Sequence, residues 1–178
     1  RFVVPEVFIE KIDGVYVITL NEDVLPRLRL SPTYQRLLSQ ARKEKGEVLE
    51  YLKTKMQTAS FLIKALDQRQ RTLYRVSEAI VVKQKDFFEY GIKHFQPLVL
   101  REIAEEIGVH EATVSRATRG KYAQTPRGTF ELKFFFSSGI ETESGVEVSS
   151  RAIKAMIKEI IASEQATHPL SDQRIAEI

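Results

Sequence analysis

The sequence has no cysteine and no tryptophan, and only two of its 178 residues are methionine. Without cysteine the chain can form no disulfide, no thiolate zinc site and no thiol nucleophile, which fits a reducing compartment. Long apolar runs are also missing, and a membrane-spanning helix needs about 20 consecutive apolar residues. No signal peptide opens the sequence. Disulfide scaffolds, cysteine enzymes and membrane-spanning proteins are therefore excluded.

The residues of common catalytic sites are present, but they lack the spacing that catalysis requires. His94, His110 and His168 are far apart, and none of them has the spacing of a metal-ligand pair. His110-Glu111 begins like a zincin motif, but Val114 stands where the second histidine belongs. The sequence also lacks a glycine-rich phosphate loop and a nucleophile elbow. We expect no enzymatic activity, no metal ion and no cofactor.

The composition is that of a folded domain whose positive charge is concentrated in one region. Hydrophobic residues make up 43% of the chain and charged residues 29%, which is enough to form a core. The net charge is only +3, but residues 111–133 contain five basic and two acidic residues. The distribution of charge is a better indicator of nucleic-acid binding than its total.

The N-terminal 46 residues predict a β-hairpin and then a helix. Residues 7–12 and 15–20 are rich in β-branched and aromatic residues. Asp13-Gly14 between them is typical of a two-residue hairpin turn, which needs two positive φ angles. Ser31-Pro32 predicts the start of a helix, which we expect to run to about residue 45 and to stop at Gly46.

Residues 47–90 contain neither glycine nor proline, and their apolar residues recur in steps of three, four and seven. This pattern predicts one very long helix, or two helices that meet near residues 54–58. It indicates either a core-facing stripe or a strut that separates two binding surfaces. Arg69 and Lys83 interrupt the stripe. Its apolar members are Ala59, Leu62, Leu66, Leu73, Val76, Ile80 and Phe87.

Residues 100–119 have the spacing of a helix-turn-helix. Gly108 stands where the chain must turn with positive φ, and the small Ala104 lets the two helices approach closely. A plain pair of helices without a ligand is the alternative. The residues that we expect to pack at the junction of the two helices are Leu100, Ile103, Ala104, Ile107, Val109, Val114 and Ala117.

The residues that this packing leaves outside are suited to contact DNA. Arg116 can donate two hydrogen bonds to guanine, and Glu111 can accept one from cytosine or hold Arg116 in place. Ala112 and the methyl group of Thr113 fit a thymine methyl, while hydroxyl and basic groups nearby suit phosphates. The predicted DNA-binding residues are His110, Glu111, Ala112, Thr113, Ser115, Arg116, Arg119, Lys121, Tyr122 and Arg127.

The remainder of the chain predicts an extended segment, a linker and a further helical domain. Residues 130–136 are apolar and look extended, and residues 137–148 are rich in Ser, Gly and Glu, as in a linker or loop. Ser149-Ser150 opens a helix, and Ser171-Asp172 caps the start of another. The apolar face of the first of these helices consists of Ile153, Met156, Ile157, Ile160 and Ile161.

The stretch 97–138 closely resembles the sigma-54 family of bacterial RNA polymerase sigma factors. The resemblance is carried by HEATVSRATRGKY followed by TPRGTFELKFFFSS. Three other segments are similar to successive parts of the family, so that the resemblance covers nearly the whole chain. They are LNEDVLPRLRLSPTY, ASFLIKALDQRQRTLYRVSEAIVVKQKDFF and PLSDQRIAEI.

The resemblance implies a division of the chain and a set of partners. Residues 1–46 would end the core-binding region, 47–138 would hold the extra-long helix and the helix-turn-helix, 139–148 would be a linker, and 149–178 would begin the domain that reads the −24 promoter element. The helix-turn-helix would read the −12 element, and core RNA polymerase would be a partner. An AAA+ ATPase would activate the full-length protein.

Two family features are missing from the sequence. They are the glutamine-rich N-terminal region and the arginine-rich C-terminal helix that reads the −24 element. We therefore interpret the chain as a fragment that neither responds to an activator nor binds that element. Arg27 and Arg29 are candidate polymerase contacts by position alone.

The sequence thus predicts a mainly α fold with a long helix, a helix-turn-helix bundle and a small N-terminal β-hairpin. The expected function is that of a monomeric, cytoplasmic sigma-54-type initiation factor fragment. A stand-alone dimeric helix-turn-helix repressor, with the long helix as its dimer seam, is the alternative; a pure protein-interaction module is a third. A repressor needs two half-sites about one DNA turn apart, whereas a sigma fragment contacts one element and binds polymerase.

Overall fold

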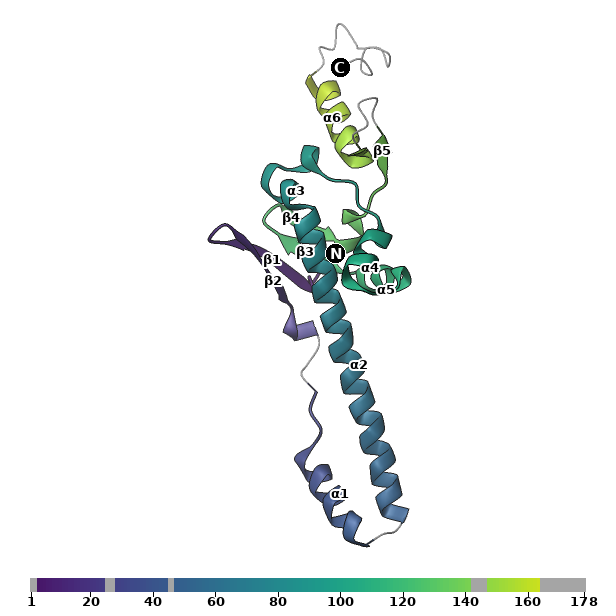
Figure 1. Ribbon diagram of the computed structural model, residues 1–178. Coiled ribbons are helices and arrows are strands. Elements are labelled where there is room, and N and C mark those ends of the chain that lie inside the picture. Colours follow the sequence, from purple (N-terminus) through teal and green to yellow (C-terminus); the bar gives the residue numbers. More distant parts are fainter. Residues whose placement is uncertain (1–2, 25–27, 45–46, 142–146, 164–178) are drawn as a thin grey trace.

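The computed structural model describes residues 3–24, 28–44, 47–141 and 147–163. The molecule is elongated: helix α2 runs from a globular part to a distant helical hairpin that it forms with α1 (Figure 1). The elements in chain order are β1 (Val7–Ile12), β2 (Val15–Leu20), η1 (Glu22–Val24), α1 (Pro32–Glu44), α2 (Glu47–Lys83), α3 (Lys85–Tyr90), η2 (Ile92–His94), α4 (Leu100–Ile107), α5 (Glu111–Thr118), β3 (Tyr122–Thr125), β4 (Gly128–Glu131), η3 (Leu132–Phe135), β5 (Gly139–Glu141), β6 (Glu147–Ser149) and α6 (Ser150–Ser163), the η elements being short 3-10 helices.

The predicted N-terminal hairpin is confirmed, but it is half of a larger sheet. β1 and β2 pair antiparallel across a turn in which Asp13 and Gly14 have φ of 50° and 81°. The sheet continues in the order β2-β1-β3-β4, with β1 and β3 parallel. The expectation of a hairpin by itself is therefore incomplete, because pairing between strands more than 100 residues apart leaves no local signal in the sequence.

The long helix α2 is continuous over 37 residues, which confirms the first of the two alternatives, one very long helix, with no break near residues 54–58. Thr54 and Thr58 stay helical, and their hydroxyls donate to carbonyls one turn earlier. The helix ends instead at Gln84, whose buried side-chain amide donates to the Gln96 carbonyl (2.8 Å) and accepts from the Gln96 N–H (3.1 Å). A buried polar residue, not a weak helix former, sets the break.

The apolar stripe faces the core in the C-terminal half of α2, whereas the N-terminal half extends away from the core like a strut. Val76 and Ile80 are fully buried in the core, against the sheet and the helix-turn-helix, which lie on opposite sides of the helix (Figure 1). The N-terminal half packs on α1 through Leu38, Leu49 and Leu52 and leaves large residues such as Phe61 exposed. The predicted start of α1 after Ser31 is confirmed, whereas its predicted stop at Gly46 lies outside the described residues.

Phenylalanine rings fill the centre of the globular part, where Phe87 packs edge-on against Phe95, Phe130 and Phe135. The prediction that residues 130–136 are extended is correct only to Glu131. There the chain turns into η3, which puts both Leu132 and Phe135 into the core. An extended strand would point these residues, three positions apart, to opposite faces.

The segment interpreted as a linker contains two short strands. β5 and β6 pair antiparallel, and the predicted helix α6 follows at Ser150. α6 rests on the globular part through Ala152 and through the guanidinium of Arg151, 4.3 Å from the Phe134 ring centre. The helix predicted at Ser171-Asp172 lies outside the described residues. Within the described part of the chain, no helix is long and apolar enough to cross a membrane.

Candidate nucleic-acid interface

Helices α4 and α5 form the predicted helix-turn-helix. α4 ends at Gly108, which adopts the left-handed conformation (φ 67°, ψ 43°), and the next N–H, of Val109, donates to the Ala104 carbonyl (2.9 Å). Ile103, Ala104 and Val114 are buried where the two helices meet. The spacing argument is thus confirmed in its geometry, and it fixes which face of α5 stays outside.

One core residue of α5 was not predicted. Ala117 is half-buried and packs against the core as expected, and its neighbour Thr118 is fully buried as well. The Thr118 hydroxyl donates to the Val114 carbonyl at 3.0 Å, which satisfies its polar group inside the protein. A threonine can therefore take a core position beside the predicted alanine.

The predicted reading residues lie together on the outer face of α5. His110, Glu111, Ala112, Arg116 and Arg119 are exposed, and Thr113 and Ser115 are half-buried beside them. His110 caps the helix, because its Nδ1 accepts from the Ala112 N–H at 3.1 Å. The first turn of α5 and a row of polar side chains thus lie on the same exposed surface.

Arg116 is held by Thr113 rather than by Glu111. Its Nη2 lies 3.5 Å from the Thr113 hydroxyl oxygen, at the outer limit of a hydrogen bond. No ion pair between described residues involves Arg116 or Arg119. Both guanidinium groups therefore keep most of their donors for a ligand.

Three further predicted DNA contacts have partners inside the protein. Lys121 pairs with Glu6 (2.9 Å), and the Tyr122 N–H donates to the same carboxylate (2.9 Å). The guanidinium of Arg127 donates to the carbonyls of Phe88 and Glu89. Their role at phosphates stays a prediction, and it requires Lys121 and Arg127 to exchange or share these partners.

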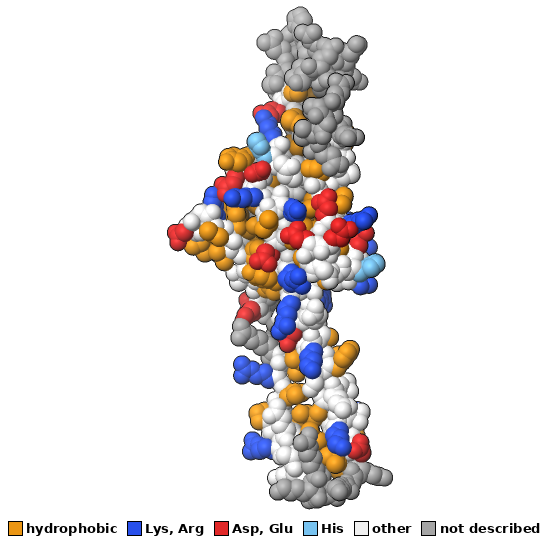
Figure 2. Space-filling model, viewed as in Figure 1, with side chains coloured by type: hydrophobic (Ala, Val, Ile, Leu, Met, Phe, Trp, Pro, Cys, Tyr) orange, Lys and Arg blue, Asp and Glu red, His pale blue; other side chains and the backbone are white. Residues whose placement is uncertain are grey.

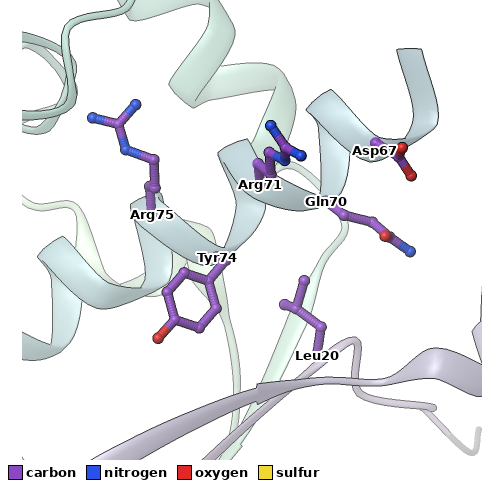
Figure 3. A pocket seen from close by; sticks show the side chains of 6 residues that line it. All are labelled: Leu20, Asp67, Gln70, Arg71, Tyr74 and Arg75. Atoms are coloured by element: carbon purple, nitrogen blue, oxygen red, sulfur yellow. The ribbon is translucent and has the colours of Figure 1, made fainter. Parts of the chain in front are cut away.

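A second basic surface borders a groove between α2 and the end of β2. The groove encloses about 530 Å³ and is lined by Leu20, Asp67, Gln70, Arg71, Tyr74 and Arg75. Figure 3 shows Leu20 and Tyr74 between the helix and the strand, while Arg71 and Arg75 point away from the strand. Figure 2 shows further basic side chains along the lower part of the molecule, over α1 and α2. Among the described residues no group of three or more acidic or histidine side chains could hold a metal.

Comparison with known families decides to which family this arrangement belongs. The family described as Sigma-54, DNA binding domain matches residues 49–178, and the family described as Sigma-54 factor, core binding domain matches residues 1–34. This chain belongs to the sigma-54 family. The first match begins near the start of α2 and includes the helix-turn-helix and α6; the second contains the hairpin β1–β2.

Individual relatives agree with this assignment. The chain is 44% identical to the RNA polymerase sigma-54 factor of Vibrio anguillarum and 42% identical to that of Escherichia coli K12, in both cases over 100% of its length. It spans only 36% and 37% of these two relatives. The crystal structure of Aquifex aeolicus sigmaN bound to promoter DNA is 35% identical, with a TM-score of 0.64, and matches 99% of this chain and 52% of that one.

Sequence reasoning missed the residues that hold the sigma-54 helix-turn-helix to the sheet. The Glu6 carboxylate accepts hydrogen bonds from Lys121 Nζ and from the Tyr122 N–H, and Glu131 accepts one from the Gly120 N–H at 3.0 Å. Glu131 lies in the stretch TPRGTFELKFFFSS but had been given no role, and Glu6 lies more than 100 residues from its partners. Of the candidate polymerase contacts, Arg29 is exposed and Arg27 lies outside the described residues.

Proposed function

We propose that this chain is the part of a sigma-54-type transcription initiation factor that docks on core RNA polymerase and reads the −12 promoter element. The observation that carries the proposal is the outer face of α5, where Arg116 and Arg119 have no ion-pair partner among the described residues. The similar Aquifex aeolicus structure was solved with promoter DNA, which supports DNA as the ligand of this face.

The proposal gives each exposed group on α5 a role. Arg116 donates to guanine O6 and N7 in the major groove, oriented by Thr113. His110, Glu111 and Ala112 face neighbouring base edges, while Ser115 and Arg119 contact phosphates, joined by Lys121, Tyr122 and Arg127 where their present partners release them. No step of this role is chemical, so the chain acts as a binding module.

The proposal also covers the partners in the cell. The N-terminal segment, with Arg29 on its surface, docks on core RNA polymerase in the bacterial cytoplasm. The chain does so as a monomer, and ATP hydrolysis by an AAA+ activator belongs to the full-length assembly. Residues 139–148 join the −12 reader to the beginning of a further domain that starts at residue 149.

The test is size-exclusion chromatography with light scattering, on the chain alone and with purified bacterial core RNA polymerase. We expect a monomer that co-elutes with the polymerase. A stable dimer that ignores polymerase contradicts the proposal and favours the alternative, a dimeric repressor. A monomer that ignores polymerase leaves the promoter-binding half of the proposal to a DNA titration with Arg116→Ala as the control.

A further inference from the structure

The sheet fastens the segment that matches the core-binding family to the helix that faces DNA. β1 lies in the first of these segments, and β3 begins four residues after α5 ends. The parallel ladder between β1 and β3 has only two residue pairs, Val7 with Ala123 and Phe8 with Gln124. Such a short ladder needs further contacts to hold one strand at a fixed angle to the other.

Glu6 supplies these contacts at the end of the ladder. Its N–H donates to the Tyr122 carbonyl (3.0 Å), and its own carbonyl accepts from the Asn21 N–H (2.9 Å). Its two carboxylate oxygens accept from Lys121 Nζ and from the Tyr122 N–H, both at 2.9 Å. One residue therefore binds both its neighbour in the hairpin and the start of β3.

The ion pair within this joint is largely withdrawn from water. The side chains of Glu6 and Lys121 are only 16% and 21% exposed. Hydrogen bonds between charged groups are stronger than neutral ones, and a partly buried pair is less screened than a surface pair. The other ion pairs between described residues have at least one side chain 39% exposed or more, so this one is the most shielded from solvent.

The connection from Glu6 to α5 is short and tied at several points. Only Arg119, Gly120 and Lys121 separate the helix from β3. The Lys121 N–H donates to the Thr118 carbonyl, and the Lys121 carbonyl accepts from the Leu132 N–H (2.7 Å). With so little free chain, a shift of β1 against β3 moves the C-terminal end of α5.

We propose that Glu6 is a positioning residue that fixes α5 relative to the polymerase-docking segment, so that binding of polymerase and reading of promoter DNA are energetically coupled. The inference rests on the proposed function, and it adds a role for a residue that touches neither partner. When two binding surfaces are held rigidly relative to each other, binding the second partner loses no further conformational entropy. Such coupling is measured as the ratio of the affinities for one partner with and without the other.

The first test measures the affinity of the chain for a promoter duplex with and without core RNA polymerase, and takes the ratio of the two. We expect Glu6→Ala to lower that ratio roughly tenfold, within the usual range of coupling between sites. Glu6→Gln keeps an acceptor for the Tyr122 N–H, so its ratio should lie between those of the unsubstituted chain and Glu6→Ala. This milder variant keeps the test valid if Glu6→Ala folds poorly. Glu105→Gln is the matched control, since it removes the exposed ion pair with Arg101 on α4, leaves the joint between β1 and β3 intact and should leave the ratio unchanged.

The second test measures a distance, which a loss of stability alone does not change. Because the chain has no cysteine, spin labels at Val15→Cys on β2 and Glu102→Cys on α4 report the hairpin and the helix-turn-helix without a background. We expect Glu6→Ala and Lys121→Met each to broaden the distance distribution, and the double variant to broaden it no further. An unchanged ratio and an unchanged distribution in Glu6→Ala overturn the inference.

The outcomes also separate this inference from the proposed function. If the unsubstituted chain binds neither the duplex nor the polymerase, the proposed function fails. If it binds both and Glu6→Ala behaves identically, only the coupling role fails. If Lys121→Met lowers the salt dependence by about one ion without broadening the distance, Lys121 is a phosphate contact and the positioning role is wrong.

Discussion

Among single residues, Arg116 offers the most direct test of the proposed DNA binding. Its side chain is exposed on α5, where its hydrogen bond to the Thr113 hydroxyl is a long one of 3.5 Å, so it can pair with a base without breaking a strong contact. We expect Arg116→Ala to cost about 1–3 kcal/mol of binding to the cognate site and to flatten base preference at one position. Titration of a set of single-base site variants measures both effects. Equal weakening on every sequence identifies Arg116 as a phosphate contact instead.

At the same scale, Glu89 fastens the hairpin to α3. Lys11 Nζ lies 2.6 and 2.7 Å from its two oxygens, and the Tyr16 hydroxyl donates to it at 3.0 Å. The hydrogen bond from Lys11, followed by the one from Tyr16, lowers the pKa of Glu89 below its ordinary value of 4.5. Burial, followed by the Glu89 contact, raises the pKa of Tyr16 to about 12.

These shifts predict how stability depends on pH. The Glu89 contribution is complete above pH 4.5 and is lost as pH falls through the lowered pKa of the folded state. The Tyr16 contribution is complete below pH 10 and is lost as pH rises toward 12. We expect Glu89→Gln to unfold at lower urea than the unsubstituted chain at pH 7, and the difference between the two midpoints to narrow as the pH is lowered below 4.5. A difference that stays constant over the whole acid range contradicts this.

At the scale of an element, the turn of the helix-turn-helix tests the backbone argument. Gly108 has φ 67°, and a Cβ placed there meets no atom within 4 Å. Gly108→Ala should therefore cost only the left-handed strain, about 1–2 kcal/mol. Gly91, with φ 98°, has Arg127 Nη1 3.2 Å from the same position, so Gly91→Ala should cost more. Urea unfolding measures the loss of stability in each variant. Equal losses contradict the expected additional steric cost at Gly91.

Elements with a local signal were predicted well, and those without one were not. The hairpin turn at Asp13-Gly14 and the helix start at Pro32 depend on residues next to each other, and both are confirmed. Local pattern left open whether the long helix breaks near residues 54–58; it is unbroken there and ends at Gln84, whose buried amide bonds to Gln96, 12 residues away. Burial of two side chains likewise turned part of an apparent strand into η3.

At the scale of the whole molecule, the elongated shape sets α5 apart from the hairpin of α1 and α2 (Figure 1). If α5 and its flanks alone contact the duplex, as proposed, the chain neutralises few phosphates. We expect binding of the isolated chain to a −12 duplex to be weak and to fall steeply with salt. Titrations at several salt concentrations measure this. A nanomolar complex that is insensitive to salt contradicts it.

The amino-acid sequence is sufficient to predict the family, from segments along nearly the whole chain, and the helix-turn-helix with the outward face of α5, because these two depend on residue spacing within about 20 positions. How these parts are joined follows from tertiary contacts. They put β1 beside β3, pair Lys121 with Glu6 and Arg127 with the Phe88 and Glu89 carbonyls of α3, and so give two predicted phosphate contacts partners inside the protein. Contacts of this kind form between residues that chain folding brings together from far apart, and no local pattern encodes them.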